Sequence, residues 1–180
     1  MLPPSLPYHN LLLTGHIGIG RVTVGRLIAR QLGVQFIDLD TEVQLRENMP
    51  PEEIRTLFGE SRLRAIEDVI CREFSLRRGA VLSVSGPTLL EESIRERLLN
   101  SGPMLILSCG LNEILRRMHA SQGARFHDPK VRSLALYQIR REKQIEQLPA
   151  MPRLDTTKLT MEEVAEKAIE FWRDNDRPAA

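Results

Sequence analysis

Three short runs of residues are almost fully hydrophobic, at 10–14, 80–85 and 104–109. Strands that are buried on both faces have this composition, because helices cover both sides of a parallel sheet. Stretches with helical spacing lie between these runs, at 22–32, 51–77 and 91–100. The alternation of strand and helix predicts a layered α/β domain, with the hydrophobic runs at the centre of a parallel sheet.

Two further short strands are expected at 34–38 and 153–156. Thr160 and Glu163 form a capping-box pattern, which predicts a last helix through about Trp172. The chain has 180 residues, enough for one domain with a sizeable core. We therefore expect residues 1–180 to form a single domain with its core at about 10–172. Short flexible termini should flank it, including a frayed end at 174–180.

Basic and acidic residues are nearly balanced, with 25 of one kind against 24 of the other and a net charge of +1. This balance gives no electrostatic reason to expect nucleic acid or an anionic membrane as a partner. The start of the chain has no basic leader followed by a long apolar run, so we expect a cytoplasmic protein. Cys71 and Cys109 have no ligand-spaced Cys or His around them, which predicts two core thiols.

A glycine-rich segment, GHIGIGRVT from Gly15 to Thr23, lies directly between the first expected strand and the first expected helix. Gly15 and Gly20 have the spacing of the phosphate-binding loop G-x-x-x-x-G-K-[ST]. The backbone N–H groups of that loop surround a phosphate at the N-terminus of a helix. Glycines suit this task because a Cβ would obstruct the φ values and the close approach that it requires. A tight turn that needs glycine for its geometry alone is the alternative interpretation.

Two side chains depart from this motif. Arg21 stands where a lysine should contact the β- and γ-phosphates, and it keeps the positive charge on a wider planar group. Val22 stands where a Ser or Thr hydroxyl should bind Mg²⁺, and it has no oxygen. Thr23 has a hydroxyl, but one step along a helix turns a side chain by about 100°. The motif is therefore degenerate where it should contact the phosphates and the metal.

Together with the loop, three segments resemble the shikimate kinase family: TVGRLIA at 23–29, FIDLD at 36–40 and FGESRLRAIE at 58–67. They follow the order of the family and nearly its spacing, and the resemblance extends from about Asn10 to Trp172. It implies a P-loop fold of the nucleoside-monophosphate-kinase type, with three α/β/α layers and a five-stranded parallel sheet in the order 2-3-1-4-5. It also implies transfer of the γ-phosphoryl group of ATP to the 3-hydroxyl of shikimate, with Mg²⁺ as the metal.

Asp38 and Asp40 follow an expected strand and should emerge at its C-terminal end, where open α/β sheets place ligands. By resemblance, Asp38 acts on the magnesium side, while Asp40 binds shikimate hydroxyls and orients the attacking one. Two acids in a solvated turn are the alternative. Arg64 matches the arginine that holds the carboxylate of shikimate. Helical spacing also allows Arg64 an ion pair with Glu60 or Glu67.

The rest of the family pattern is less complete. Gly86 is the one glycine kept from a run of three that approaches shikimate and the transferred phosphate, and the adjacent Pro87 lacks an N–H. Arg125 aligns with the lid arginine that closes over the phosphates, with an ordinary loop arginine as the alternative. Either Arg140 or Arg141 should be the second ligand of the substrate carboxylate, and spacing does not decide between them.

We therefore expect Arg21, Asp40 and Arg125 as catalytic residues and Asp38 as the metal ligand. Nucleotide binding is expected from Gly15, Gly18, Gly20, Arg21, Val22, Thr23 and Arg125, and substrate binding from Asp40, Arg64, Gly86, Arg140 and Arg141. No role is expected for His16, and His119 and His127 should be exposed lid residues.

Two functions remain open. One is an active shikimate kinase in which Arg21 replaces the lysine. The other is a pseudokinase that binds shikimate or a related carboxylate, as a sensor or as a partner subunit. Phosphoryl transfer depends on positioning and electrostatics, so each displaced contact lowers the rate on the order of 10²-fold. With Arg21, Val22 and Pro87 all altered, we expect ligand recognition by a monomer, weakened ATP and Mg²⁺ binding, and weak or absent catalysis.

Overall fold

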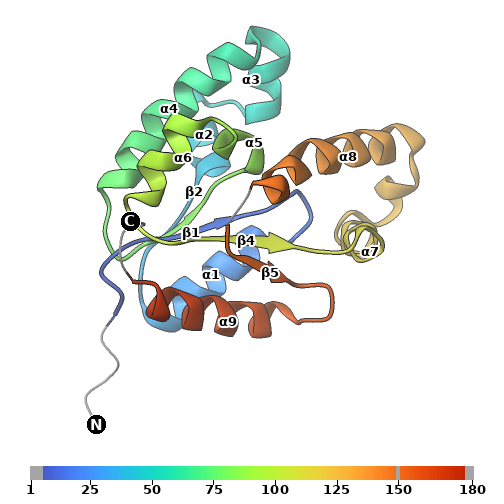
Figure 1. Cartoon of the computed structure of the whole chain (residues 1–180). Helices are drawn as coiled ribbons and strands as arrows, with labels where there is room; N and C mark the ends of the chain where they lie inside the picture. The colour runs from blue at the N-terminus through green and yellow to red at the C-terminus, as the bar shows by residue number, and fades with distance from the viewer. Residues whose placement is uncertain (1–5, 149–150, 177–180) are drawn as a thin grey trace.

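The computed structural model describes residues 6–148 and 151–176. Within them, five parallel strands form one sheet in the order β2-β3-β1-β4-β5 (Figure 1). The strands are β1 (Leu11–Thr14), β2 (Phe36–Asp38), β3 (Val81–Ser83), β4 (Met104–Ser108) and β5 (Arg153–Asp155). This order confirms the sheet implied by the family resemblance, and each strand lies inside the run of residues predicted for it.

Helices cover both faces of the sheet, which gives the three layers that were predicted. On one face lie α1 (Arg21–Leu32) and α9 (Met161–Asp174). On the other lie α2 (Leu39–Glu47), α4 (Glu60–Leu76), α5 (Gly86–Leu89) and α6 (Glu92–Leu99), with α3 (Pro51–Phe58) packed against α4. At one end of the sheet, on the right in Figure 1, is a lobe made of α7 (Leu111–Gln122), η1 (Gly123–His127), α8 (Pro129–Glu142) and η2 (Lys143–Gln147).

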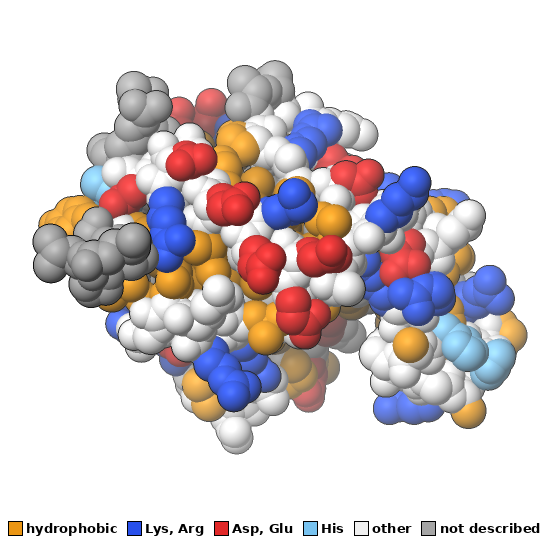
Figure 2. Space-filling view, turned by 90° about the horizontal axis from the view of Figure 1, so that it is seen from below, with side chains coloured by type: hydrophobic (Ala, Val, Ile, Leu, Met, Phe, Trp, Pro, Cys, Tyr) orange, Lys and Arg blue, Asp and Glu red, His pale blue; other side chains and the backbone are white. Residues whose placement is uncertain are grey.

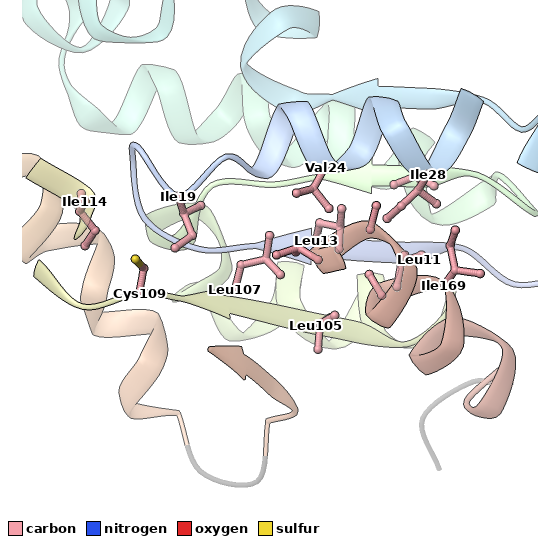
Figure 3. Packing of buried hydrophobic residues seen from close by; sticks show 14 of the residues in the cluster. Leu11, Leu13, Ile19, Val24, Ile28, Leu105, Leu107, Cys109, Ile114 and Ile169 are labelled. Atoms are coloured by element: carbon pink, nitrogen blue, oxygen red, sulfur yellow. The ribbon is translucent and has the colours of Figure 1, made fainter. Parts of the chain in front are cut away.

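Successive residues of a central strand face opposite layers. Leu11 and Leu13 of β1 belong to a buried cluster with α1 and α9, while Leu12 belongs to a second cluster with α2, α4 and α6. Figure 3 shows part of the first cluster, with side chains from β1, β4, α1 and α9 and, next to them, Ile19 of the loop, Cys109 and Ile114. A strand covered on both faces has no position where a polar side chain reaches water, which explains the uninterrupted hydrophobic runs.

The stretch 51–77 forms two helices, where the helical spacing predicted one. α3 ends at Phe58 and α4 begins at Glu60, and between them Gly59 has φ 87° and ψ 165°. Residues with a Cβ rarely adopt this conformation, so the glycine determines where the helix breaks. Because of this break, α3 and α4 are separate helices that run in different directions (Figure 1).

The last helix begins with the predicted capping box. The Thr160 hydroxyl accepts the Glu163 N–H at 3.2 Å, and the Glu163 carboxylate accepts the Thr160 N–H at 2.8 Å. The helix continues to Asp174, and the carboxylate of Asp176 accepts the N–H groups of Tyr8 and His9, each at 2.8 Å. These contacts correct the expectation of a frayed end for residues 174–176, while 177–180 lie outside the described residues.

Cys71 and Cys109 are both buried free thiols, as predicted. In the part of the chain that the structure describes, no helix has the length and hydrophobicity needed to cross a bilayer.

Candidate functional site

The glycine-rich segment forms a loop between β1 and the N-terminus of α1. Gly18 and Gly20 have φ values of 80° and 93°, in the left-handed region that favours glycine. The free N–H groups of the first turn of α1 lie at the end of this loop, where the helix dipole adds positive potential. A cavity of about 460 Å³ follows the loop and is lined by residues 16–23, Arg117, Ser121 and Met161. We call it the loop cavity, and its geometry suits an anion.

Arg21, the first residue of α1, directs its side chain toward α2. Its Nη1 donates to the carbonyl oxygen of Gly15 and its Nη2 donates to Oδ2 of Asp40, each at 3.2 Å. Only 11% of the Arg21 side chain is exposed. The guanidinium group therefore connects the start of the loop to α2, and it lines both the loop cavity and a neighbouring one.

This second cavity has a volume of about 200 Å³ and shares Ile17 and Arg21 with the loop cavity. Its walls come from α2, α3, α4, the turn after β3 and the C-terminal end of α8. We call it the ion-pair cavity because of the charged side chains that line it: Arg21, Asp40, Glu52, Arg55, Glu67, Arg141 and Glu142. The structure thus places Asp40 beside the loop, in a cavity lined by both arginine and carboxylate side chains.

Three carboxylates of the ion-pair cavity hold protons more tightly than usual. Partial removal from water raises the pKa of Asp40, whose side chain is still 42% exposed, and the nearby Arg21 cation partly opposes this shift. Burial also raises the pKa of Glu67 to about 7, although a hydrogen bond from Thr88 opposes it. The pKa of Glu142 is raised to about 7 for the same reason. At neutral pH the cavity therefore contains carboxyl groups that can donate as well as accept hydrogen bonds.

Glu60, the first residue of α4, gathers three arginines at the rim of the ion-pair cavity. Arg55 Nε and Arg141 Nη2 each donate to its carboxylate at 2.7 Å, and Arg64 Nε lies 3.7 Å from Oε1. The Arg64 side chain is 47% exposed and its Nη1 donates to Glu91 at 3.3 Å. Arg64 thus makes an ion pair with Glu60, the alternative that helical spacing allowed. Arg55 and Arg141, in contrast, line the cavity.

The C-terminal end of α8 brings Arg141 to the ion-pair cavity, while Arg140 is exposed and lines neither cavity. The turn after β3 packs against this end of α8. Gly86 is buried there, and a Cβ on it would lie 2.9 Å from the carbonyl oxygen of Glu142. Gly86 therefore does not line the cavity itself, but its lack of a side chain allows α8 to approach the turn.

Asp38 ends β2 and caps α2. Its Oδ2 accepts the N–H of Thr41 at 3.1 Å and the Thr41 hydroxyl at 2.9 Å. Its Oδ1 is buried and has no hydrogen-bond partner in the described part of the chain, and Asp38 is not among the residues that line either cavity. Val22 lines the loop cavity without offering an oxygen. The residues at this end of the sheet therefore fit a cation only in part.

Arg125 is exposed in η1 and lines neither cavity, although the sequence predicted it over the phosphates. Arg117 of α7 lines the loop cavity, a position that sequence reasoning missed. Its Nη1 donates to the carbonyl oxygen of Ile19 at 3.2 Å and its Nη2 to that of Thr156 at 2.7 Å. In the sequence, Arg117 forms an ordinary i,i+4 pair with Glu113, so no pattern indicated that it supports the loop.

His16 is buried inside the loop, although no role was expected for it. One ring nitrogen, Nδ1, lies 3.0 Å from the carbonyl oxygen of Ile17, and Nε2 lies 3.7 Å from Oε1 of Glu146 in η2. Burial lowers the pKa of His16, which favours the neutral ring. The imidazole fills space between the loop and the lobe.

Comparisons with known proteins identify the family and the fold of this chain. The family model for shikimate kinase matches residues 17–173. A shikimate kinase of Thermodesulfovibrio yellowstonii is 32% identical over 170 residues, which cover 91% of this chain and 94% of that one. One from Geobacter sulfurreducens is 29% identical over 166 residues, with 92% of each chain covered.

Among solved structures, the shikimate kinase of Acinetobacter baumannii in complex with shikimate has the same fold. Its TM-score to this chain is 0.76 at 23% identity, over 92% of this chain and 93% of that one. The family match begins within the loop, at residue 17, and ends at residue 173 in the last helix, so it includes every residue that lines the two cavities except His16. On this sequence similarity, the chain belongs to the shikimate kinase family.

Proposed function

We propose that this chain binds shikimate, or a closely similar polyhydroxy carboxylate, in the ion-pair cavity and ATP in the loop cavity, with weak or absent phosphoryl transfer between them. The observation that carries this proposal is the contact between Arg21 and Asp40. It joins the two cavities at the residue where the lysine of the loop motif would stand. Ligands bound in the two cavities meet at Arg21.

The ion-pair cavity has the groups that a polyhydroxy carboxylate needs. Asp40 accepts hydrogen bonds from hydroxyl groups, and the carboxyl groups of Glu67 and Glu142, with pKa values of about 7, can donate to them. Arg141 presents a planar cation that can bind a carboxylate through two parallel hydrogen bonds. The relative from Acinetobacter baumannii was solved with shikimate, which supports this class of ligand.

A substrate carboxylate would take the place of Glu60. Arg55, Arg64 and Arg141 share that one carboxylate. Ion pairs that are partly exposed to water contribute only about 0–1 kcal/mol each, so the arginines can exchange it for a ligand at small cost. Through Glu60, Arg64 belongs to this arginine cluster, and a turn of its exposed side chain would bring it to the ligand.

The loop cavity suits the nucleotide of the family, because shikimate kinases use ATP with Mg²⁺. Backbone N–H groups around Gly18 and Gly20 and the N-terminus of α1 would bind phosphate oxygens. Arg117 holds the loop in this shape through the Ile19 carbonyl group. The exposed position of Arg125 on η1 leaves it able to approach the same phosphates from the lobe.

The transfer step is where this chain departs from its family motif. Mg²⁺, when bound with ATP, neutralises charge on the β- and γ-phosphates. Asp38 Oδ1 would face this ion, but Val22 supplies no oxygen ligand. Arg21 donates to Gly15 and Asp40, so its charge is already engaged on the shikimate side of the loop. Since phosphoryl transfer depends on positioning, we propose that these two changes weaken metal binding and catalysis.

The same contact supports an active kinase as the second candidate. An arginine that lines both cavities lies between a phosphate bound at the loop and a hydroxyl bound at Asp40. Positive charge at that place stabilises a transferred phosphoryl group. In this case Arg21 replaces the lysine with a group that reaches further.

An ADP-release assay with ATP, Mg²⁺ and shikimate decides between the two, alongside calorimetric titration of shikimate and of ATP. We expect the wild type to bind both ligands and to release ADP near the rate measured without shikimate. The double variant Arg21→Lys, Val22→Ser should raise the shikimate-dependent rate at least tenfold. Arg30→Lys, an exposed change on the same helix, serves as the matched control and should leave the rate as in the wild type.

Rapid, shikimate-dependent ADP release by the wild type would establish the active kinase. Failure of shikimate to bind, with ATP binding intact, would instead remove the proposed ligand while leaving the nucleotide site. The two parts of the proposal are therefore tested separately.

A further inference from the structure

Two exposed histidines of the lobe face each other. His119 lies in the last turn of α7 and His127 ends η1, and their Nε2 atoms are 3.0 Å apart. The ring centroids are 4.8 Å apart and the rings are inclined at 84°. Figure 2 shows histidine side chains exposed together on the lobe, which projects at the right of the view. Neither residue takes part in the two cavities.

The backbone between the two histidines holds them in this arrangement. Gly123 ends α7 with φ 56°, and its N–H donates to the carbonyl oxygen of His119. The chain then reverses through η1, where Phe126 is buried and lies edge-on to the His119 ring at 6.3 Å between centroids. A tight turn anchored by a buried aromatic ring therefore brings His127 back against the end of α7.

Two Nε2 atoms at this separation can share one proton, or both can offer a lone pair to one metal ion. Imidazole nitrogen binds transition metals at about 2.0–2.1 Å, and two such bonds spanning 3.0 Å enclose an angle of roughly 95° at the metal. This angle is close to the right angle of tetragonal Cu²⁺ and Ni²⁺ sites. A tetrahedral Zn²⁺ ion would require the two nitrogens to move apart by roughly 0.3–0.4 Å.

We propose that His119 and His127 form a two-histidine site for a divalent transition-metal ion, with geometry that favours Cu²⁺ or Ni²⁺. In residues 6–148 and 151–176 no third His, Cys, Asp or Glu joins them, so water completes the coordination and the ion can exchange. The site is distinct from that of the Mg²⁺ that accompanies ATP, because Mg²⁺ prefers oxygen ligands. A bound ion would tie η1, which carries Arg125, to the end of α7.

Calorimetric titration of the untagged, nucleotide-free chain with NiCl₂ and with CuSO₄ tests the site. We expect one ion per chain, and an electron paramagnetic resonance spectrum of the Cu²⁺ form with two nitrogen ligands. His119→Gln and His127→Gln should each weaken binding at least tenfold. His9→Gln removes a histidine that pairs with Asp176 elsewhere on the surface, and it should leave the affinity unchanged.

A second measurement does not depend on counting ligands. Because the ion binds the folded lobe, a saturating concentration should raise the melting temperature of the wild type and of His9→Gln, but not of His119→Gln. Equal metal affinity in the wild type and in both variants of the pair would place the ion elsewhere and overturn the proposal. So would a spectrum with a single nitrogen ligand in the wild type.

Discussion

Arg21 Nη2 lies 3.2 Å from Asp40 Oδ2, so the first residue of the loop helix is tied to a residue 19 positions further along the chain. The arginine is almost enclosed at 11% exposure, while Asp40 keeps 42% of its side chain accessible. A ligand can therefore reach the carboxylate without first displacing the guanidinium group.

Asp40→Asn removes the charge that faces both Arg21 and the proposed ligand. A hydrogen bond to a charged group contributes about 1.5–3 kcal/mol, so we expect shikimate affinity to fall at least tenfold. ATP affinity should change less than threefold, because the phosphate contacts proposed for ATP come from backbone N–H groups of the loop and not from Asp40. Calorimetry with each ligand measures both effects, with Glu53→Gln on the exposed side of α3 as the control. An unchanged dissociation constant for shikimate would show that Asp40 is not a ligand.

Arg141 and Arg140 are adjacent in the sequence but differently placed, which makes them a matched pair. Arg141 lines the ion-pair cavity and donates to Glu60, whereas Arg140 is exposed. We expect Arg141→Ala to weaken shikimate binding at least tenfold and Arg140→Ala to weaken it less than twofold. Titration calorimetry compares the two variants directly, and the reverse order of effects would contradict the placement of α8.

The parallel sheet could be predicted because its three central strands are uninterrupted hydrophobic runs, while the order of its strands came from the family resemblance. The break at Gly59 could not, since a glycine within a helical pattern costs only about 1 kcal/mol and does not require a break. That break places Arg55 of α3 at the ion-pair cavity, where no motif indicated it.

The position of Asp40 beside the loop followed from its place after a strand, but the partner of its carboxylate did not. A side chain as long as arginine can turn toward a phosphate or toward Asp40, and only the packing of α2 decides between them. Likewise, the choice between Arg140 and Arg141 depends on a rotation of about 100° per residue. The packing of α8 against α5 determines which of the two arginines faces the cavity, and this cannot be deduced from spacing along the chain.

Glu67 should make the stability of this protein depend on pH. The residue is only 6% exposed, and burial raises the pKa of its carboxyl group from the ordinary 4.5 to about 7. The folded state then binds more protons than the unfolded state between these values. The contribution of Glu67 to the free energy of unfolding is therefore fully present below pH 4.5, and it is lost as the pH rises through 7.

Glu67→Gln should remove this loss, because an amide keeps the shape of the side chain without a charge. At pH 8 we expect the variant to be more stable than the wild type by about 1–3 kcal/mol, and at pH 5 the two should differ little. Urea unfolding at both pH values measures the difference. Glu96→Gln, an exposed change on α6, should show no such pH dependence. A variant that is equally stabilised at pH 5 would rule out ionisation as the cause.

Gly86→Ala tests whether the approach of α8 to the turn after β3 supports the ion-pair cavity. The added Cβ would meet the carbonyl oxygen of Glu142 at 2.9 Å, and backbone atoms cannot rotate away as a side chain can. Overpacking of this kind costs about 1–3 kcal/mol, which lowers the melting temperature by roughly 2–10 °C. The end of α8 should also move outward with Arg141, so shikimate affinity should fall more than ATP affinity.

Gly110→Ala is the matched control for this change. Its φ is −64°, which alanine adopts without strain, and the nearest atom to the new Cβ is 3.7 Å away on Thr157. Melting temperature and shikimate affinity should therefore stay close to those of the wild type. If Gly86→Ala behaved in the same way as Gly110→Ala, the turn after β3 would have room for a side chain. The position of Arg141 would then have to be set by contacts within the lobe, and not by the close approach of Gly86 to α8.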